Sequence, residues 1–118
     1  MESILTSIKK MLGIEETYAH FDADIIFHIN SALMTLNQLG VGPKGGFFVT
    51  TDEQTWFDFL GDSTRFEAVK SYIYARVKML FDPPTSSSVI EAMNKQIAEF
   101  EWRLNVQAES TESTETEV

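Results

Sequence analysis

The 118-residue chain contains no cysteine, which excludes disulfides, zinc sites built on thiolates and catalysis by a thiol. Long hydrophobic runs are also missing. No run approaches the roughly 20 successive apolar residues that a membrane span needs. The N-terminus lacks the order of charges and then apolar residues that is typical of a signal peptide. We therefore expect a protein that stays where it is made and has no membrane partner.

Basic residues are scarce: 9 Lys and Arg stand against 18 Asp and Glu, and the net charge is −9. Beyond the pair Lys9-Lys10 there is no basic cluster, and phosphate contacts need clustered cations. Direct nucleic-acid binding is therefore not expected. The acidic charge is compatible with a place beside DNA, because a negative wall repels DNA and lets it slide.

The sequence carries no constellation typical of an enzyme. His20, Asp24 and His28 are spaced by four, as metal ligands on one helix face would be. However, His20 precedes the expected helix, so an ordinary structural role is the better interpretation. The glycine-rich segment 42–46 lacks the Gly-Lys-Ser/Thr ending of a phosphate-binding loop. We expect no catalytic, metal-binding or cofactor-binding residues and no cofactor.

Apolar periodicity predicts an all-α fold, a small bundle of about four main helices. Their expected ranges are residues 2–12, 23–39, 63–81 and 89–106. Gly13 ends the first helix, with Lys9 on its solvent side. Asp22 caps the second helix, Asp62-Ser63 caps the third, and a capping box from Ser88 to Glu91 starts the fourth after the Pro83-Pro84 break.

Residues 40–51 separate the second and third main helices and are the least helical part. Four glycines and one proline surround the apolar run Phe47-Phe48-Val49. This segment is expected to be a long loop or to form a short β arm. A short helical turn through Trp56 follows, capped by Thr51 with Gln54 or by Asp52.

The chain divides into a helical domain, residues 1–106, and an acidic tail, residues 107–118. Four glutamates fall in the last ten residues, among serines and threonines. Such a segment buries too little apolar surface to order itself, so we expect it to be disordered unless a partner holds it.

Too many apolar residues lie off the main stripes for one small core. Phe27 and Met34 lie on the far side of the second helix, Tyr72 and Met79 belong to a second stripe on the third, and Trp102 points away from the stripe of the fourth. Exposed apolar patches usually mark interaction surfaces. We expect part of this set to contact other subunits.

Arg76 lies inside an apolar arc, where a buried charge needs a partner. One interpretation is an ion pair with an acid of another element or subunit. The other is that its stem lies on the core while its head stays in water.

The segment TWFDFLGDSTRFEAVKSYIYARVKMLFDPPTSSSVIEAMNKQIAEFEWRLN resembles the head-tail connector proteins of tailed phages, also called adaptor or head completion proteins. The shared features are an aromatic turn before Gly-Asp, a helix rich in Tyr and Lys that ends in LFDPP, and a helix that starts at Ser and ends in EWRLN. The resemblance covers roughly residues 2–106, with LNQLGVG upstream fitting the same pattern.

This resemblance implies a structural virion protein at the head–tail interface, assembled in the host cytoplasm, and not an enzyme. Such connectors form a ring, typically a dodecamer, under the portal protein. The ring extends the DNA channel, passes DNA without sequence-specific binding, and gives stopper or tail-completion proteins a docking surface. The family fold is a small helical bundle with a long loop between its second and third main helices.

Three sets of candidate interaction residues follow from the resemblance and the off-stripe residues. The set expected to dock on the portal is Phe100, Trp102, Arg103 and Val106. The loop set, expected to reach a neighbour, the stopper or the channel, is Lys44, Phe47, Phe48 and Val49. The set expected between subunits is Phe27, Met34, Tyr72, Arg76 and Met79.

Two alternatives compete with the connector. One is an intracellular helical adaptor or regulator that binds another protein as a monomer or dimer. The other is a small enzyme whose active site forms between subunits. Oligomer size distinguishes the first alternative from a connector. Metal content and a histidine titration test the second.

Overall fold

The computed structural model describes residues 2–62 and 65–116, with side chains as far as Glu109. Within this part of the chain there are five helices: α1 (Ile4–Met11), α2 (Asp22–Gln38), α3 (Trp56–Leu60), α4 (Phe66–Phe81) and α5 (Ser87–Thr116). The described residues form no strand beyond an isolated antiparallel bridge between Ser3 and Thr55. The all-α class is confirmed, and the alternative of a short β arm is wrong.

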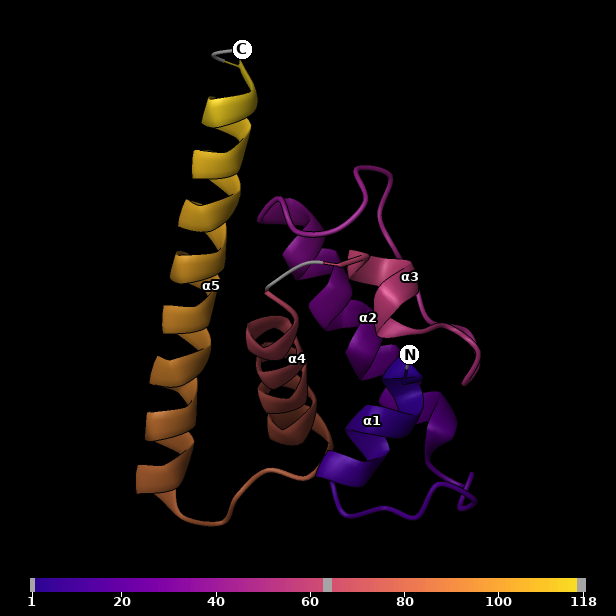
Figure 1. Ribbon diagram of the computed structural model, residues 1–118. Coiled ribbons are helices and arrows are strands. Elements are labelled where there is room, and N and C mark those ends of the chain that lie inside the picture. The colour runs from indigo at the N-terminus through magenta and orange to yellow at the C-terminus, as the bar shows by residue number, and fades with distance from the viewer. Residues whose placement is uncertain (1, 63–64, 117–118) are drawn as a thin grey trace.

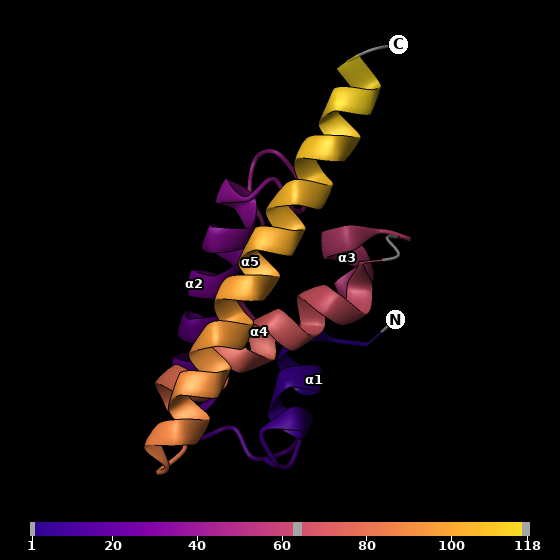
Figure 2. The same ribbon diagram turned by 90° about the vertical axis from the view of Figure 1, so that its left-hand side faces the viewer.

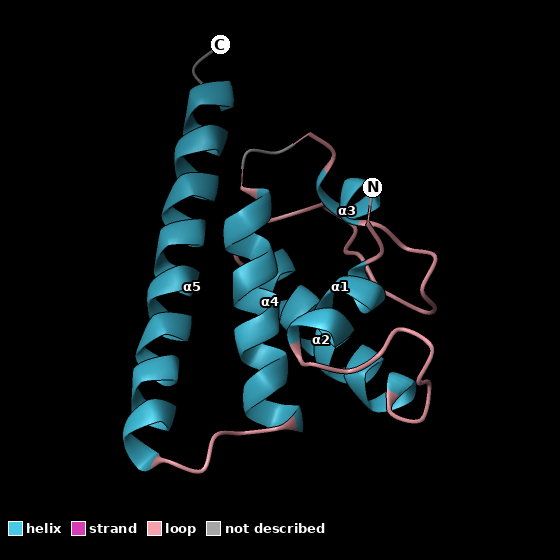
Figure 3. Cartoon of the chain, turned by 60° about the horizontal axis from the view of Figure 1, so that its bottom comes forward, coloured by secondary structure: helices cyan, strands magenta, loops and turns pink. Residues whose placement is uncertain are grey.

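Helix α4 lies between α2 and α5 and packs against both (Figures 1 and 3). Helix α1 packs against α2 and α4 on the side of the molecule away from α5. The 30-residue α5 forms one edge of the molecule, and its C-terminal turns extend past the other elements (Figure 1). A long helix that is covered on one side only leaves much of its surface for other contacts.

The core consists of the apolar stripes of these helices. On α2 the buried residues are the predicted ones, Ile25, Ile29, Ala32, Leu33 and Leu36. On α4 the buried residues are Val69, Tyr72, Ile73, Ala75 and Val77. In contrast, α5 contributes one buried apolar side chain among its described residues, Leu104, and the rest of its stripe is half-buried. Burial of apolar area therefore holds α1, α2 and α4 together more tightly than it holds α5.

Lys9 is buried, contrary to the prediction that it lies on the solvent side of α1. Only 2% of it is exposed. Its Nζ atom donates to the backbone oxygens of Glu16 (3.0 Å) and Tyr18 (2.7 Å) and lies 2.8 Å from Asp22 Oδ1. The loop after α1 folds back over the helix and supplies these partners. Asp22 is the first residue of α2 and not its N-cap, which is Phe21.

The cap of α3 differs from the predicted one. Thr55 is the N-cap, and a capping box joins it to Asp58: each residue's side chain accepts from the other's backbone N–H. Gln54 Oε1 instead accepts from the backbone N–H groups of Thr50 and Thr51. Two chemically suitable caps lie within five residues, and the one that forms joins Thr55 to Asp58.

The starts of α4 and α5 also shift. Helix α4 begins at Phe66, and Ser63 of the expected Asp62-Ser63 cap lies outside the described residues. Helix α5 begins at Ser87, before the expected cap, and the Ser86 backbone oxygen accepts from Ile90 N–H at 3.1 Å.

Helix α5 continues to Thr116, past the predicted helix end near Val106. Neither Gly nor Pro follows Val106, so nothing in the sequence breaks the helix. Asn105 Nδ2 donates to the Leu39 backbone oxygen at 3.4 Å, and a Cβ atom on Gly40 would lie 3.0 Å from Ala108 Cβ. Residues 105–108 thus pack on the C-terminal end of α2. Disorder of residues 107–118 in the free chain stays a prediction, and residues 117–118 lie outside the described part.

Candidate interaction surfaces

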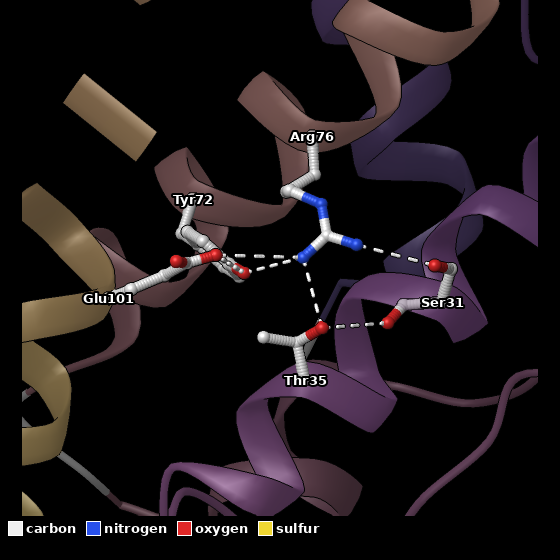
Figure 4. A network of polar contacts seen from close by, with 5 residues as sticks. All are labelled: Ser31, Thr35, Tyr72, Arg76 and Glu101. Carbon is white, nitrogen blue, oxygen red and sulfur yellow. Dashed lines mark hydrogen bonds and ion pairs between the residues drawn. The ribbon is translucent and has the colours of Figure 1, made fainter. Parts of the chain in front are cut away.

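A polar network joins α2, α4 and α5 around Arg76 (Figure 4). The Arg76 guanidinium donates to Thr35 Oγ1 (3.1 Å), Ser31 Oγ (3.3 Å) and Tyr72 Oη (2.6 Å), and lies 3.8 Å from a Glu101 carboxylate oxygen. Tyr72 Oη in turn donates to Glu101 at 2.7 Å. Of the two interpretations of Arg76, the structure supports an ion pair with another element, and that element belongs to the same subunit.

The network turns Tyr72 inward. Its side chain is fully buried, and burial together with the hydrogen bond to Glu101 raises the pKa of the Tyr72 hydroxyl to about 12. Met79 is half-buried on the same helix. Tyr72 and Arg76 therefore link the helices of one subunit, and Phe27 and Met34 are the members of the expected subunit-contact set that face solvent.

Phe27 and Met34 are 71% and 55% exposed. They are seven residues apart, two turns of α2, and lie opposite its buried stripe. We call the surface formed by Asp24, Phe27 and Met34 the α2 outer face. A phenylalanine this exposed leaves most of its apolar area in water, as is typical of a residue that a partner covers.

The expected portal-docking residues of α5 separate onto two surfaces. Trp102 (67% exposed) and the exposed Val106 lie one turn apart on the side away from the core. Phe100 is half-buried against the core, and Arg103 pairs with Glu99 at 2.5 Å. Phe100 and Arg103 line a hollow together with Gln96 and Glu99.

The loop set also separates. Lys44 and Phe48 are exposed, whereas Phe47 packs on Phe59 with 5.2 Å between ring centres. Val49 is buried, and its backbone N–H and C=O both bond to the Asn30 side chain, at 2.7 and 2.9 Å. Lys44 and Phe48 are thus the loop residues that can reach another molecule.

The family model described as "Phage connector protein" matches residues 4–111. The chain belongs to this family. Its match includes α1 through most of α5, so the connector fold contains all five helices described here. No curated protein and no solved structure matches this connector protein.

Membership of the phage connector family indicates a virion component that interacts with head or tail proteins, and favours a structural role over an enzymatic one. Within the part of this connector that the structure describes, no three His, Asp or Glu side chains lie where they could share a metal ion. His28 is half-buried beside the Phe27 ring, and His20 packs edge-on against Phe21. None of the described helices has the length and apolar character that crossing a membrane requires.

Glu101, Ser31 and Thr35, which complete the Arg76 network, were not predicted from the sequence. A signal for Glu101 is present. Of the acids of the last helix, it is the one beside the apolar stripe, next to Phe100 and three residues before Leu104. A charged residue at such a position would be expected to face the core side and pair with a buried cation.

Proposed function

We propose that this connector protein assembles as a ring of identical subunits under the portal, continues the DNA channel and provides the docking surface for stopper or tail-completion proteins. The family match over residues 4–111 carries the proposal. Two exposed apolar surfaces on one small subunit support it: the α2 outer face, and Trp102 with Val106 on α5. A connector subunit needs one surface for its neighbours in the ring and another for the portal, and two separate exposed apolar surfaces can serve these two contacts.

Trp102 and Val106 are the proposed portal contact. They lie on the solvent side of the longest helix, and an exposed Trp is a frequent anchor in protein interfaces. Replacing Trp102 by Ala should weaken binding to the cognate portal by at least about tenfold, since removing an anchor costs about 2 kcal/mol or more. Asn94→Ala, at an exposed residue of the same helix, is the control. Unchanged portal affinity of a folded Trp102→Ala protein would contradict this assignment.

The tip of the loop, with Lys44 and Phe48, is the proposed contact to a neighbouring subunit, the stopper or the channel. Lys44 is exposed on a turn closed by a bond from Gly46 N–H to the Pro43 oxygen at 3.0 Å. Deleting residues 44–46 should impair ring contacts or stopper joining while the subunit keeps its helical circular dichroism. An unfolded deletion variant would show that the tip is part of the core and would contradict the proposed role.

The acidic charge supports the channel role. With a net charge of −9, the subunit surface repels phosphates, so DNA is expected to pass without binding. Fluorescence anisotropy with labelled duplex DNA should show no binding at physiological salt. Tight binding that weakens steeply with added salt would point to a phosphate-binding surface and contradict a passive conduit.

A further inference from the structure

We infer that Phe27 on the α2 outer face of one subunit inserts into the hollow formed by Gln96, Glu99, Phe100 and Arg103 on α5 of a second copy. The inference rests on the proposed ring and specifies which two surfaces meet in it. The hollow and the α2 outer face are both unoccupied by any other part of the described chain.

The hollow has the residue pattern of a coiled-coil hole. Gln96, Glu99, Phe100 and Arg103 occupy positions i, i+3, i+4 and i+7 of one helix. Four residues with this spacing surround the space into which a side chain of a facing helix inserts as a knob. Phe100, half-buried against the core, supplies an apolar wall. A large apolar side chain on a neighbouring helix is therefore the group that fits.

Phe27 is the knob that this subunit offers. At 71% it is the most exposed of the large hydrophobic side chains described. Met34 lies two turns further along the same face, so the face presents a short apolar row on a helix. A helix face, rather than a loop, is what packing against another helix requires.

The hollow lies on the side of α5 that faces away from α2 of the same subunit. Asn105 faces α2, because its side chain donates to the Leu39 oxygen. Gln96 precedes Asn105 by nine residues, which at about 100° a residue places it about 180° around the helix. Figure 2 shows α2 on one side of α5 and α3 on the other. A contact that joins two unlike faces is head-to-tail, the kind that closes a ring.

The direction of the helices fits such a contact. Within one subunit α2 and α5 run the same way, since Thr35 meets Arg76 beside Glu101, and Leu39 meets Asn105 further along both helices. Successive subunits of a twelve-membered ring are rotated by about 30°. Helix α2 of one subunit and α5 of the next therefore stay close to parallel, as knobs-into-holes packing needs.

Charge supports the same pairing. Helix α2 contains no Lys or Arg, and Asp24 lies one turn before Phe27 on the outer face. With Phe27 in the hollow and the helices parallel, Asp24 falls beside Gln96 and Lys95 of the second copy. The Gln96 amide can donate to the carboxylate, and Lys95 supplies an opposite charge. The occupant that the hollow fits is thus a second copy of this chain.

The test uses engineered disulfides, which have no background because the chain has no cysteine. Asp24→Cys and Gln96→Cys are combined in one chain, and the protein is oxidised mildly under the condition, alone or with the cognate portal, in which the wild type assembles. Because each subunit then carries both halves of the bridge, denaturing electrophoresis should show a ladder of dimers, trimers and higher species. Chains with one of the two cysteines should stay monomeric.

The control pair is Asp24→Cys with Ala98→Cys, which places the second thiol on the other edge of α5, about 200° from Gln96. Three outcomes would overturn the inferred contact. They are an equal ladder from this control pair, no ladder from the Asp24/Gln96 pair, and dimers from Asp24→Cys alone. A second variant, Phe27→Asp, should abolish assembly or weaken it more than about tenfold, whereas Leu80→Asp, at another exposed apolar residue, should not.

The mass of the wild-type assembly is measured first, so that a failure of the proposed ring can be distinguished from a failure of the inferred contact. A ring-sized wild type without the Asp24/Gln96 ladder overturns the contact and leaves the ring standing. A wild type that stays monomeric with the portal overturns the ring, and the contact with it.

Discussion

At the scale of single residues, two cations hold the subunit together. Lys9 links α1 to the following loop and to Asp22 at the start of α2. Arg76 links α4 to α2 and to Glu101 on α5. Each cation supplies several donors to oxygens of other elements, which compensates for the removal of a charge from water.

Removing the Lys9 charge should destabilise the subunit. Lys9→Met keeps much of the buried stem but leaves the Asp22 carboxylate and two backbone oxygens without their donor. We expect a loss of about 2–3 kcal/mol in the free energy of unfolding, measured by urea denaturation. Lys10→Met, the exposed neighbour, should change it by less than about 0.5 kcal/mol. Equal effects of the two substitutions would contradict the role of Lys9.

Tyr72 should make stability depend on pH in the alkaline range. Its hydroxyl has a pKa of about 12 in the fold against about 10 in the unfolded chain, so the folded state holds this proton more tightly. The resulting stabilisation is complete below pH 10 and is lost as the pH rises to about 12. The free energy of unfolding, measured by urea denaturation at a series of pH values, should fall between about pH 10 and pH 12. Tyr72→Phe should lack this part of the fall.

An ultraviolet titration checks the assignment directly. One of the three tyrosines should ionise near pH 12, and Tyr72→Phe should remove that late phase. A late phase that persists in Tyr72→Phe would show that another tyrosine is responsible.

At the scale of elements, apolar spacing predicted the positions of the helices well and their ends poorly. The stripe of α2 was predicted residue by residue, because a 3.6-residue period follows from burial alone. Caps are decided by single hydrogen bonds between chemically similar candidates, as at Thr55 and Gln54. The interaction surfaces were predicted in part: Phe27 and Trp102 face solvent, but Tyr72 turns inward toward Glu101, which lies 29 residues away in sequence.

The loop between α2 and α3 depends on Gly42. It has φ of +90°, and an added Cβ atom would lie 2.3 Å from the Phe59 ring. Gly42→Ala should therefore lower the free energy of unfolding by about 2 kcal/mol or more, from backbone strain and the clash. Gly45→Ala, with no atom near its Cβ position, is the matched control and should change little. Equal stability of the two variants would contradict this packing of the loop.

The end of α5 should contribute to stability past the predicted helix end at Val106. A chain that stops after Val106 loses the contact between Ala108 and Gly40, whereas a chain that stops after Thr111 keeps it. We expect the shorter chain to be less stable by about 1 kcal/mol in thermal or urea unfolding. Identical stability of the two truncated chains would show that α5 needs nothing after Val106.

At the scale of the whole molecule, the subunit combines a firmly packed body, α1 to α4, with a long helix bound along one side (Figure 2). Its exposed apolar residues lie on separate surfaces rather than in one patch, which suits contacts to several neighbours. A monomeric adaptor would need only one such surface.

The mass of the purified protein in solution tests the central proposal most directly. It would be measured by light scattering or native mass spectrometry, alone and with the cognate portal. We expect a ring-sized species in at least one sample, about 161 kDa for twelve copies of the 13.4 kDa chain plus any bound portal. A monomer or dimer in both samples would contradict the ring and favour a helical adaptor that acts without assembling.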